Sequence, residues 1–566
     1  MIRDLGSLCD GIYDLLVVGA GIHGACVARD AALRGLRVAL VDQADFGNAT
    51  SHNSYKIIHG GLRYLQHMDF GRVRESINEA RYWRQAAPHL VRPLQFVIPT
   101  YGYGTRGPLA LWLGLQAHGM IGWDRNRDVP DGWQMPPGKV MSKSHCLELI
   151  PGIDPQSVSG CAAWYDGQMQ DSDRLLLECV MSASDAGATV ANYVSVESFI
   201  GTDSRVMGVL ARDALAGKEF EIRSSLTINA GGPWAASLLS RSGKPPPAAA
   251  SKGLVKGMNL VTRRVIEGAH AIGVPSKRSS DAVIGDSQRL YFICPWRGRS
   301  LVGTTHFPFD GDPSNLTISD DEIAEFIDEV NLAYPQAKLD MDDVLYCYSG
   351  LTPGEGVDPD SDANRARHSD VIDHQKLEQV DGIVSIVGVK FTTARLVAEH
   401  VVDLAFRKLG RKPAACNVRS VPLPGAVGFD GFGNLKQDID GLTAGVGSDS
   451  DNIRFLLESH RSSFPDIGNI SIPEHQDARD YLFQQCCRHA VKSEMAVRLS
   501  DLLFRRTDLA ARGELTEADI QWCTDLMVGE LAWSDARLKE ELRNTKVDCE
   551  QRFFHPKMKE STLVTA

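Results

Sequence analysis

Residues 13–42 read YDLLVVGAGIHGACVARDAALRGLRVALVD, and this stretch decides the fold. It opens with an apolar run that predicts a buried strand, turns through Gly19, Gly21 and Gly24, and continues as a helix of small residues. A second apolar run predicts another strand, which ends at Asp42. The stretch therefore predicts one strand–helix–strand unit of an α/β fold.

The three glycines have different physical roles. Gly19 permits a tight turn, Gly21 lets the backbone approach a pyrophosphate, and Gly24 lets the helix pack close to the sheet. The N–H groups at the start of the helix favour bound phosphate. Asp42, about twenty residues further on, can accept hydrogen bonds from ribose hydroxyls. Because strand, turn, helix, second strand and acid follow in this order, we expect a dinucleotide-binding site.

Composition narrows the class of protein. A length of 566 residues predicts two or three domains, and 43% hydrophobic with 23% charged residues is typical of a soluble globular chain. The net charge of −12, without any lysine-rich or arginine-rich run, argues against nucleic-acid binding. The twelve cysteines lack metal-ligand spacing, so we expect reduced thiols and no metal site. Charges near the N-terminus do not fit a signal peptide, and we expect a cytoplasmic protein.

One apolar segment has two interpretations. Residues 108–123, PLALWLGLQAHGMIGW, contain no Asp, Glu, Lys or Arg but are shorter than a membrane span requires. The segment is either a core or interdomain helix or a surface that contacts a membrane from one side.

The segment after Asp42 gathers donor and titratable side chains around a Gly-Gly pair. Residues 56–65 read KIIHGGLRYL, which predicts a turn into a short helix. Each such residue alone is more often a surface group, but their concentration is unusual for a passive loop. We take Lys56, His59, Arg63 and Tyr64 as candidate site residues.

Two further turns point to a cofactor. An apolar strand ends in Asn-Ala-Gly-Gly at 229–232, where the backbone must pass close to a flat or bulky group. Residues 382–395, GIVSIVGVKFTTAR, predict a second strand, a turn at Gly388 and a helix start. Such a turn aims N–H donors at an electron-rich group. A flavin ring, which gains negative charge along one edge on reduction, would need such donors.

The remaining chain divides into two parts. Alternating apolar residues before residue 354 predict an antiparallel sheet suited to cover a substrate pocket. From about residue 427 onward the periodicity is helical. We expect these helices to stabilise or oligomerise the protein rather than to take part in catalysis.

These segments together resemble the FAD-dependent glycerol-3-phosphate dehydrogenases over nearly the full length of the chain. The matching pieces include VVGAGIHGACVARDAALRG, HGGLRYL, INAGGPW, LVGTT, YSG and KFTTAR, and HGGLRYL and KFTTAR are far more specific than the glycine motif. The resemblance implies an α/β protein with a Rossmann-like FAD-binding domain, an antiparallel β-sheet cap domain for the substrate and a C-terminal α-helical domain. The expected boundaries are 1–90, 155–235 and 355–410 for the first, 91–154 and 236–354 for the second, 425–550 for the third, and 551–566 for a flexible tail.

The resemblance also implies a reaction. The C2 hydrogen of sn-glycerol 3-phosphate leaves as hydride to FAD while a base takes the hydroxyl proton and cations stabilise the alkoxide, giving dihydroxyacetone phosphate. The expected catalytic residues are His59, as proton acceptor, with Arg63 and Lys390. Those expected to contact the substrate are Arg63, Tyr64, Asn259, Thr305 with its neighbour Thr304, Thr352, Arg367 and Lys390. Those expected to bind FAD are Gly19, Gly21, Gly24, Asp42, Thr50, Ser51, Lys56, His59, Gly60, Gly61, Ala230, Gly231, Gly388, Lys390, Phe391 and Thr392.

Three positions depart from the family's pattern. Thr352 stands where the family has a substrate arginine, Asn259 where it has a pocket histidine, and His306 where it has an aspartate. Losing a desolvated guanidinium contact typically costs a few kcal/mol. An alternative substrate is therefore another small phosphorylated or phosphonylated alcohol, such as a longer polyol phosphate. A flavin-binding protein without turnover is a further alternative, and an NAD-dependent enzyme would leave the turn at Gly388 unexplained.

The family further implies an electron acceptor, which is quinone at a membrane surface or, in some members, oxygen. Peripheral attachment to the inner face of the cell membrane and a homodimer are both compatible with the sequence.

Overall fold

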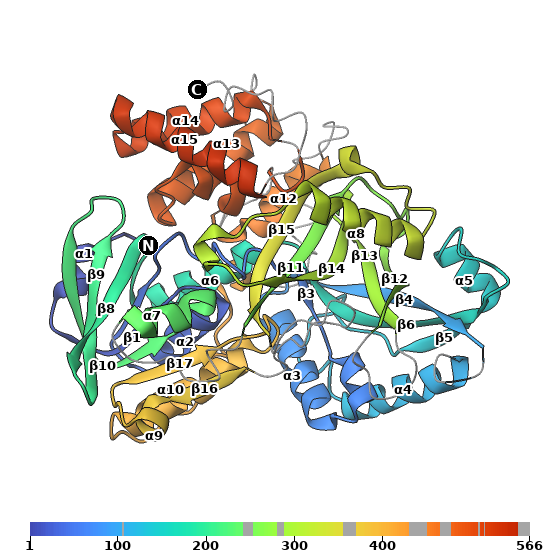
Figure 1. Ribbon diagram of the computed structural model, residues 1–566, viewed down its shortest axis with the longest axis horizontal. Helices are drawn as coiled ribbons and strands as arrows, with labels where there is room; N and C mark the ends of the chain where they lie inside the picture. The colour runs from blue at the N-terminus through green and yellow to red at the C-terminus, as the bar shows by residue number, and fades with distance from the viewer. Residues whose placement is uncertain are drawn as a thin grey trace.

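The computed structural model describes residues 1–102, 104, 107–241, 253–279, 288–354, 369–429, 450–463, 472, 477–507, 510–513 and 515–552. They form two β-sheets that lie side by side, and helices of the C-terminal part lie above them in the view of Figure 1. A mixed α/β architecture with a helical C-terminal region is therefore confirmed.

The first sheet contains the predicted strand–helix–strand unit. Its inner strands β1, β2, β10 and β17 run parallel, so their carboxyl ends meet at one edge. Their apolar runs form strands because they are buried on both faces. The strand order is β16 (Asp370–Asp373), β17 (Ile383–Val387), β10 (Glu219–Asn229), β1 (Ile12–Val18), β2 (Val38–Val41) and β7 (Thr189–Ala191), and β9 (Arg205–Asp213) and β8 (Val194–Thr202) extend it antiparallel from β10.

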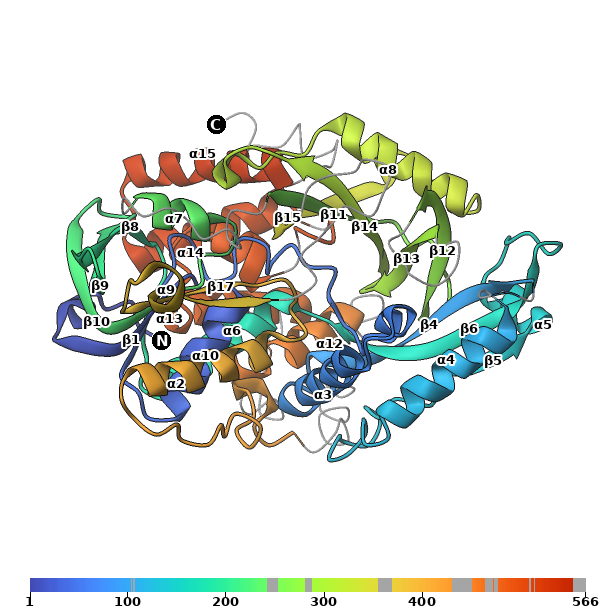
Figure 2. The ribbon, with the colours of Figure 1, turned by 60° about the horizontal axis from the view of Figure 1, so that its bottom comes forward.

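Helix α2 (Ile22–Leu33) packs closely on this sheet and lies next to α6 (Ser172–Asp185) and α10 (Ala394–Lys408). Figure 2 shows α2 and α10 side by side. A Cβ on Gly24 would lie 1.8 Å from the carbonyl oxygen of Gly19, so only glycine permits this approach. The role predicted for Gly24 in helix packing matches this geometry.

The second sheet is largely antiparallel, and helix α8 (Asp320–Ala333) covers one of its faces. Ile323, Phe326 and Val330 of α8 share a buried cluster with Val274 and Tyr291 of the sheet. The strand order is β15 (Val344–Pro353), β11 (Leu254–Thr262), β14 (Arg299–Phe309), β13 (Gln288–Trp296), β12 (His270–Ser279), β4 (Val91–Tyr101), β6 (Val158–Met169) and β3 (Ile57–Ile58), with β5 (Lys139–Ser142) paired to β6.

Strands β3 and β6 belong to the second sheet, although the expected boundaries assign most of their residues to the FAD-binding domain. Residues 155–235 are expected in the FAD-binding domain, yet β6 pairs with β4 along its length and so lies in the second sheet. Residues 57–58, also assigned to the first domain, pair with β6. The boundaries themselves stay a prediction.

The C-terminal helices pack against the second sheet. Ile453, Leu457 and Phe483 share a buried cluster with Trp296 and Tyr348 of the sheet, because both surfaces are apolar. These helices are therefore continuous with the core of the second sheet. They are α12 (Ser450–Ser459), η7 (Arg461–Ser463), α13 (Ala478–Ser493), the π-helix η9 (Asp501–Arg506), α14 (Glu517–Leu531) and α15 (Asp535–Arg552). Of the expected tail, 551–552 belong to α15 and the rest lies outside the described residues.

Helix α4 (Pro108–Ile121) is the apolar segment for which two interpretations are open. Only Leu115 and His118 of this helix are buried. Leu109, Leu113 and Met120 are exposed, which does not fit a core helix. In the described ranges, no helix combines the length and apolar character needed to cross a membrane.

The remaining elements connect these layers. Among them, η1 and α3 follow the predicted turn after His59 directly. They are α1 (Leu5–Cys9), η1 (Leu62–His67), α3 (Phe70–Ala86), α5 (Lys143–Leu149), η2 (Gly232–Trp234), α7 (Ala235–Arg241), η3 (Pro313–Asn315), η4 (Met341–Asp343), α9 (His374–Glu378) and η5 (Pro424–Ala426).

Candidate active site

A cavity of about 800 Å³ lies where the carboxyl ends of β1, β10 and β17 meet β11, β14 and β15. Both glycine turns, at Gly19–Gly21 and at Gly388, line it. The two glycine turns therefore face one cavity, as a cofactor bound by both of them requires.

At the first glycine turn two backbone segments approach each other so closely that no side chain has room. Gly19 has a φ of +98°, and a Cβ there would lie 2.5 Å from the carbonyl oxygen of Ala230. Ala230 and Gly231 directly follow β10 and also line the cavity. The Asn-Ala-Gly-Gly segment is thus brought against the first turn, as its sequence suggests.

Asp42 stands at the end of β2 and lines the cavity. Its carboxylate accepts hydrogen bonds from the backbone N–H of Ala20 at 2.6 Å and of Ala44 at 2.9 Å. Burial raises the pKa of this carboxyl to about 6. Ser51 approaches the same turn, because its hydroxyl accepts a hydrogen bond from the N–H of Ile22 at 3.0 Å.

His23 joins the two turns. A Cβ on Gly388 would lie 2.5 Å from Nδ1 and Cε1 of His23. Burial lowers the pKa of His23 to about 4, so its imidazole is neutral at physiological pH. Its buried Nε2 atom has no hydrogen-bond partner among the described residues. A buried polar atom of this kind beside a glycine turn fits a site where a bound group supplies the hydrogen bond.

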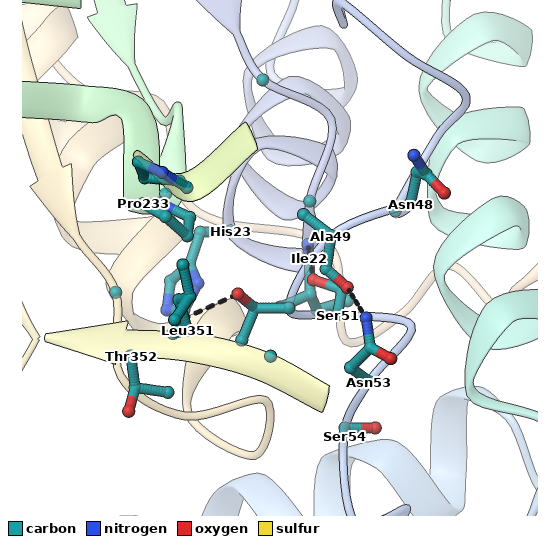
Figure 3. Close-up of a pocket in the computed structure, with 18 of the residues that line it drawn as sticks. Ile22, His23, Asn48, Ala49, Ser51, Asn53, Ser54, Pro233, Leu351 and Thr352 are labelled. Carbon is teal, nitrogen blue, oxygen red and sulfur yellow. Dashed lines mark hydrogen bonds between the residues drawn. The ribbon is translucent and has the colours of Figure 1, made fainter. Parts of the chain in front are cut away.

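The loop that carries residues 49–54 forms another wall of the cavity. The hydroxyl of Thr50 donates to the carbonyl oxygen of Leu351 at 2.7 Å, and Asn53 Oδ1 accepts from the N–H of Ser349 at 3.1 Å. Figure 3 shows this loop beside the strand with Leu351 and Thr352. Hydrogen bonds between chain segments about 300 residues apart thus hold the wall together.

The adjoining wall, which β11, β14 and β15 form, carries polar groups. The hydroxyl of Thr304 donates to Asn259 Oδ1 at 2.6 Å, and His306 and Thr352 lie on the same wall. The hydroxyl of Thr352 is buried and has no partner in the part of the chain that the structure describes. The expected residue Thr305 does not line the cavity. It pairs with Met258, which belongs to the buried cluster under α8.

His59 and Lys390 line the same cavity from different segments. The ammonium of Lys390 lies 4.4 Å from the ring centroid of Tyr64, and the rings of Tyr64 and His59 are 6.0 Å apart. The N–H of His59 donates to the hydroxyl of Thr392 at 3.3 Å. The HGGLRYL and KFTTAR segments thus meet at one point.

Other expected residues lie elsewhere. Arg63 is exposed and outside the cavity lining, because η1 turns it away after Gly61, whose φ is +74°. Gly60, Gly61 and Tyr64 lie behind the lining residues rather than among them. Arg367 lies outside the described residues.

Lys56 is part of the lining, but its ammonium is directed into a buried polar cluster. It donates to Ser172 Oγ at 2.8 Å and lies 4.2 Å from the ring centroid of Tyr348. Burial lowers its pKa. This contact pattern favours a supporting role for Lys56 over direct contact with a cofactor.

Sequence reasoning missed several lining residues, among them three with polar side chains. His23 lies inside the glycine motif, Asn53 lies between the expected residues Ser51 and Lys56, and Ser349 lies in the YSG segment. The position of Asn53 between two expected residues is a signal that could have found it. The contacts of His23 with Gly388 depend on the tertiary structure.

The residues of this cavity fit FAD. Gly19 and Gly21 present backbone without side chains to the cavity. His23 offers a buried polar atom that has no partner among the described residues, and Asp42 lies at the strand end suited to a ribose.

Comparison with known proteins agrees with this fit. Residues 14–404 match the family described as FAD dependent oxidoreductase, and residues 416–538 match the C-terminal domain of alpha-glycerophosphate oxidase. The chain is 33% identical to a glycerol-3-phosphate dehydrogenase of Synechocystis sp. over 90% of this chain and 91% of that one. It is 29% identical to that of Mycobacterium leprae, over 95% of this chain and 88% of that one.

A solved structure shows the same fold. The glycerol-3-phosphate dehydrogenase of Bacillus halodurans, complexed with FAD, superposes with a TM-score of 0.73 at 23% identity, covering 97% of this chain and 96% of that one. The chain therefore belongs to the FAD-dependent oxidoreductase family, in the group of the glycerol-3-phosphate dehydrogenases.

Proposed function

We propose that this protein oxidises sn-glycerol 3-phosphate to dihydroxyacetone phosphate with FAD as its cofactor. The observation that carries the proposal is the convergence of His59 and Lys390 on the cavity that both glycine turns line. The relatives that cover most of the chain have the same activity in their names. Bound FAD would supply the hydride acceptor.

The chain's own residues would hold the cofactor at two places. The turn with Gly19 and Gly21, together with Ser51 and Asp42, would bind the pyrophosphate and ribose. Gly388, Phe391 and Thr392 would hold the flavin end, since they line the cavity in the turn before α10.

Two side chains would accept the hydroxyl proton and stabilise the negative charge that develops on the alkoxide. His59 would accept the hydroxyl proton, because imidazole is the side chain whose ordinary pKa lies near neutrality. Lys390 would stabilise the alkoxide or the phosphate by its positive charge. Its ammonium lies over the Tyr64 ring, which limits the positions that it can take.

A second candidate is oxidation of another small phosphorylated or phosphonylated alcohol. Thr352 replaces an arginine of the family, and its buried hydroxyl lacks a partner within the described ranges. A longer polyol phosphate would offer that hydroxyl a hydrogen-bond partner. This observation favours a substrate with an additional hydroxyl group.

The electron acceptor in our proposal is a quinone at a membrane surface, reached through α4. Leu109, Trp112, Leu113, Met120 and Trp123 form an exposed apolar face, and Arg127 lies over the Trp123 ring at 5.0 Å. Aromatic residues next to a basic group are typical of proteins that lie on a membrane from one side. The location would then be the inner face of the cell membrane.

Sedimentation with anionic phospholipid vesicles tests the α4 face. Replacing Trp112 and Leu113 by serine should abolish binding without changing the reduction of the flavin by substrate. If the wild type forms a dimer that the same substitutions separate, the face is a contact between two copies instead.

Anaerobic titration of the purified yellow protein tests the main proposal. Glycerol 3-phosphate should remove the absorbance of the oxidised flavin, and a panel of polyol phosphates should do so less efficiently. A longer polyol phosphate that reduces the flavin faster would favour the second candidate. If dithionite alone bleaches the flavin, the protein binds flavin without turnover of these substrates.

A further inference from the structure

The backbone of Gly60 is held on both sides by buried side chains. Its N–H donates to Asp166 Oδ1 at 2.5 Å, and its carbonyl oxygen lies 3.2 Å from Nε2 of His118. The second oxygen of Asp166 accepts from the indole N–H of Trp164 at 2.9 Å. Gly60, Asp166, His118 and Trp164 are all buried.

Gly60 directly follows His59, which the proposed reaction uses as proton acceptor. The N–H of His59 is itself bound to the hydroxyl of Thr392. The N–H groups before and after the His59 α-carbon are therefore both held. Asp166 of β6 binds the N–H of Gly60, and Thr392 of the KFTTAR turn binds the N–H of His59. A Cβ on Gly60 would lie 3.3 Å from both Asp166 Oδ1 and His118 Nε2, so the side chains close tightly around the peptide.

We propose that Asp166 and His118 are positioning residues that hold the imidazole of His59 at the distance required for proton transfer. The proposal rests on the proposed function. A proton acceptor must lie within hydrogen-bond reach of the substrate hydroxyl, and a displacement of about 1 Å can lower the rate about 100-fold. Neither residue lines the main cavity, so each acts through the backbone of the loop rather than on the substrate.

The chemistry of the contacts sets the form of both side chains. A carbonyl oxygen only accepts, so His118 must donate from Nε2. Burial lowers the pKa of His118, which keeps this imidazole neutral with its proton on Nε2. Asp166 accepts two N–H donors and therefore acts through both carboxylate oxygens.

Rapid anaerobic mixing of the FAD-loaded enzyme with glycerol 3-phosphate tests this proposal. His118→Leu should lower the limiting rate of flavin reduction by about tenfold or more while the substrate dissociation constant changes by less than about threefold. His118→Gln, whose amide can still donate to the carbonyl, should restore most of that rate. Asp166→Asn, which presents an amide N–H to the indole N–H of Trp164, should slow flavin reduction in the same way. This variant replaces His118→Leu in the test if His118→Leu does not fold.

The matched control is His270→Leu. His270 also faces a backbone carbonyl, at 2.7 Å, but that carbonyl belongs to Leu149 at the end of α5 and not to the loop that carries His59. Its variant should reduce flavin at the wild-type rate. An equal loss of rate in His270→Leu and His118→Leu, no loss in His118→Leu, or no recovery in His118→Gln would overturn the positioning role. A wild-type protein that glycerol 3-phosphate does not bleach would instead overturn the proposed function, and the positioning role with it.

Discussion

A Cβ atom on Gly388 would lie 2.5 Å from the imidazole of His23, so the two glycine turns of this protein touch each other. The turns are more than 360 residues apart in the sequence. Their contact closes one cavity around both ends of a cofactor that spans them.

Gly388→Ala should therefore weaken FAD binding. The added methyl group would push the His23 ring into the cavity, and less flavin should remain after purification. The double variant His23→Ala/Gly388→Ala should bind FAD more tightly than Gly388→Ala alone, because the clash is removed. Gly529→Ala is the control: nothing lies near a Cβ in that helix, and we expect normal flavin content with a gain of about 0.5–1 kcal/mol in stability.

Lys390→Met should leave FAD bound but lower the rate of flavin reduction by about 100-fold to 1,000-fold, as expected when a charge that stabilises the transition state is removed. Stopped-flow absorbance of the flavin measures this rate. Lys412→Met removes an exposed lysine close in sequence and should have no effect. A normal rate in Lys390→Met would remove this lysine from the reaction.

Thr352→Arg should strengthen glycerol 3-phosphate binding by about threefold to tenfold if the wall that carries Thr352 faces the phosphate, because a guanidinium adds charge-assisted hydrogen bonds. Thr352→Ser keeps the hydroxyl and is the matched control. Equilibrium titration of the flavin absorbance gives both constants. Weaker binding in the arginine variant would place the phosphate at another wall.

The buried side chain of His460 should make the free energy of unfolding depend on pH. Burial lowers its pKa to about 3, and neither ring nitrogen has a partner among the residues that the structure describes. Below about pH 6.5 the unfolded chain binds a proton that the folded chain does not, so stability falls as the pH falls.

His460→Leu should remove this contribution. The gain in unfolding free energy over wild type should grow by up to about 1.4 kcal/mol between pH 6.5 and pH 5.5. Thermal unfolding at both pH values measures it, and the exposed His145→Leu should show no such change. Parallel pH profiles for wild type and His460→Leu would contradict the assignment.

Arg506 of the C-terminal helices forms a buried ion pair with Asp45, which lies close after Asp42. Although burial acts to raise it, the charges of Arg506 and Arg505 hold the pKa of Asp45 below its ordinary value. Arg506→Met should destabilise the protein by about 3–5 kcal/mol, since it leaves a buried carboxylate without one partner. FAD should also dissociate faster, because Asp45 directly follows Gln43 and Ala44, which line the cavity.

The control for this pair is Arg411→Met. Arg411 pairs with Asp14 at an exposed position, where such a bridge contributes at most about 1 kcal/mol. Thermal unfolding and fluorescence of released flavin measure both variants. Equal effects of the two substitutions would mean that burial does not strengthen the Asp45 pair.

Local patterns were enough to predict the strand–helix–strand unit, the turn at Gly388 and the short helix after Gly61. These depend on apolar periodicity and on glycine at positions where a Cβ has no space, and both are readable along the chain. The meeting of His59 with Lys390 was expected from the family resemblance. The local sequence of neither segment shows that the two lie together.

The sequence by itself determined the class of cofactor, because the glycine spacing and the acid at the strand end are local requirements for a dinucleotide. Only the tertiary structure decided which side chains reach the cavity. In the tertiary structure Arg63 points away from the cavity, and Thr304 lines it where Thr305 does not. Helix α4 is exposed, and Asp166 and His118 contact the backbone of Gly60. The physical reason is that strand pairing and helix packing set which face of each element is buried, and residues far apart in the chain determine that pairing.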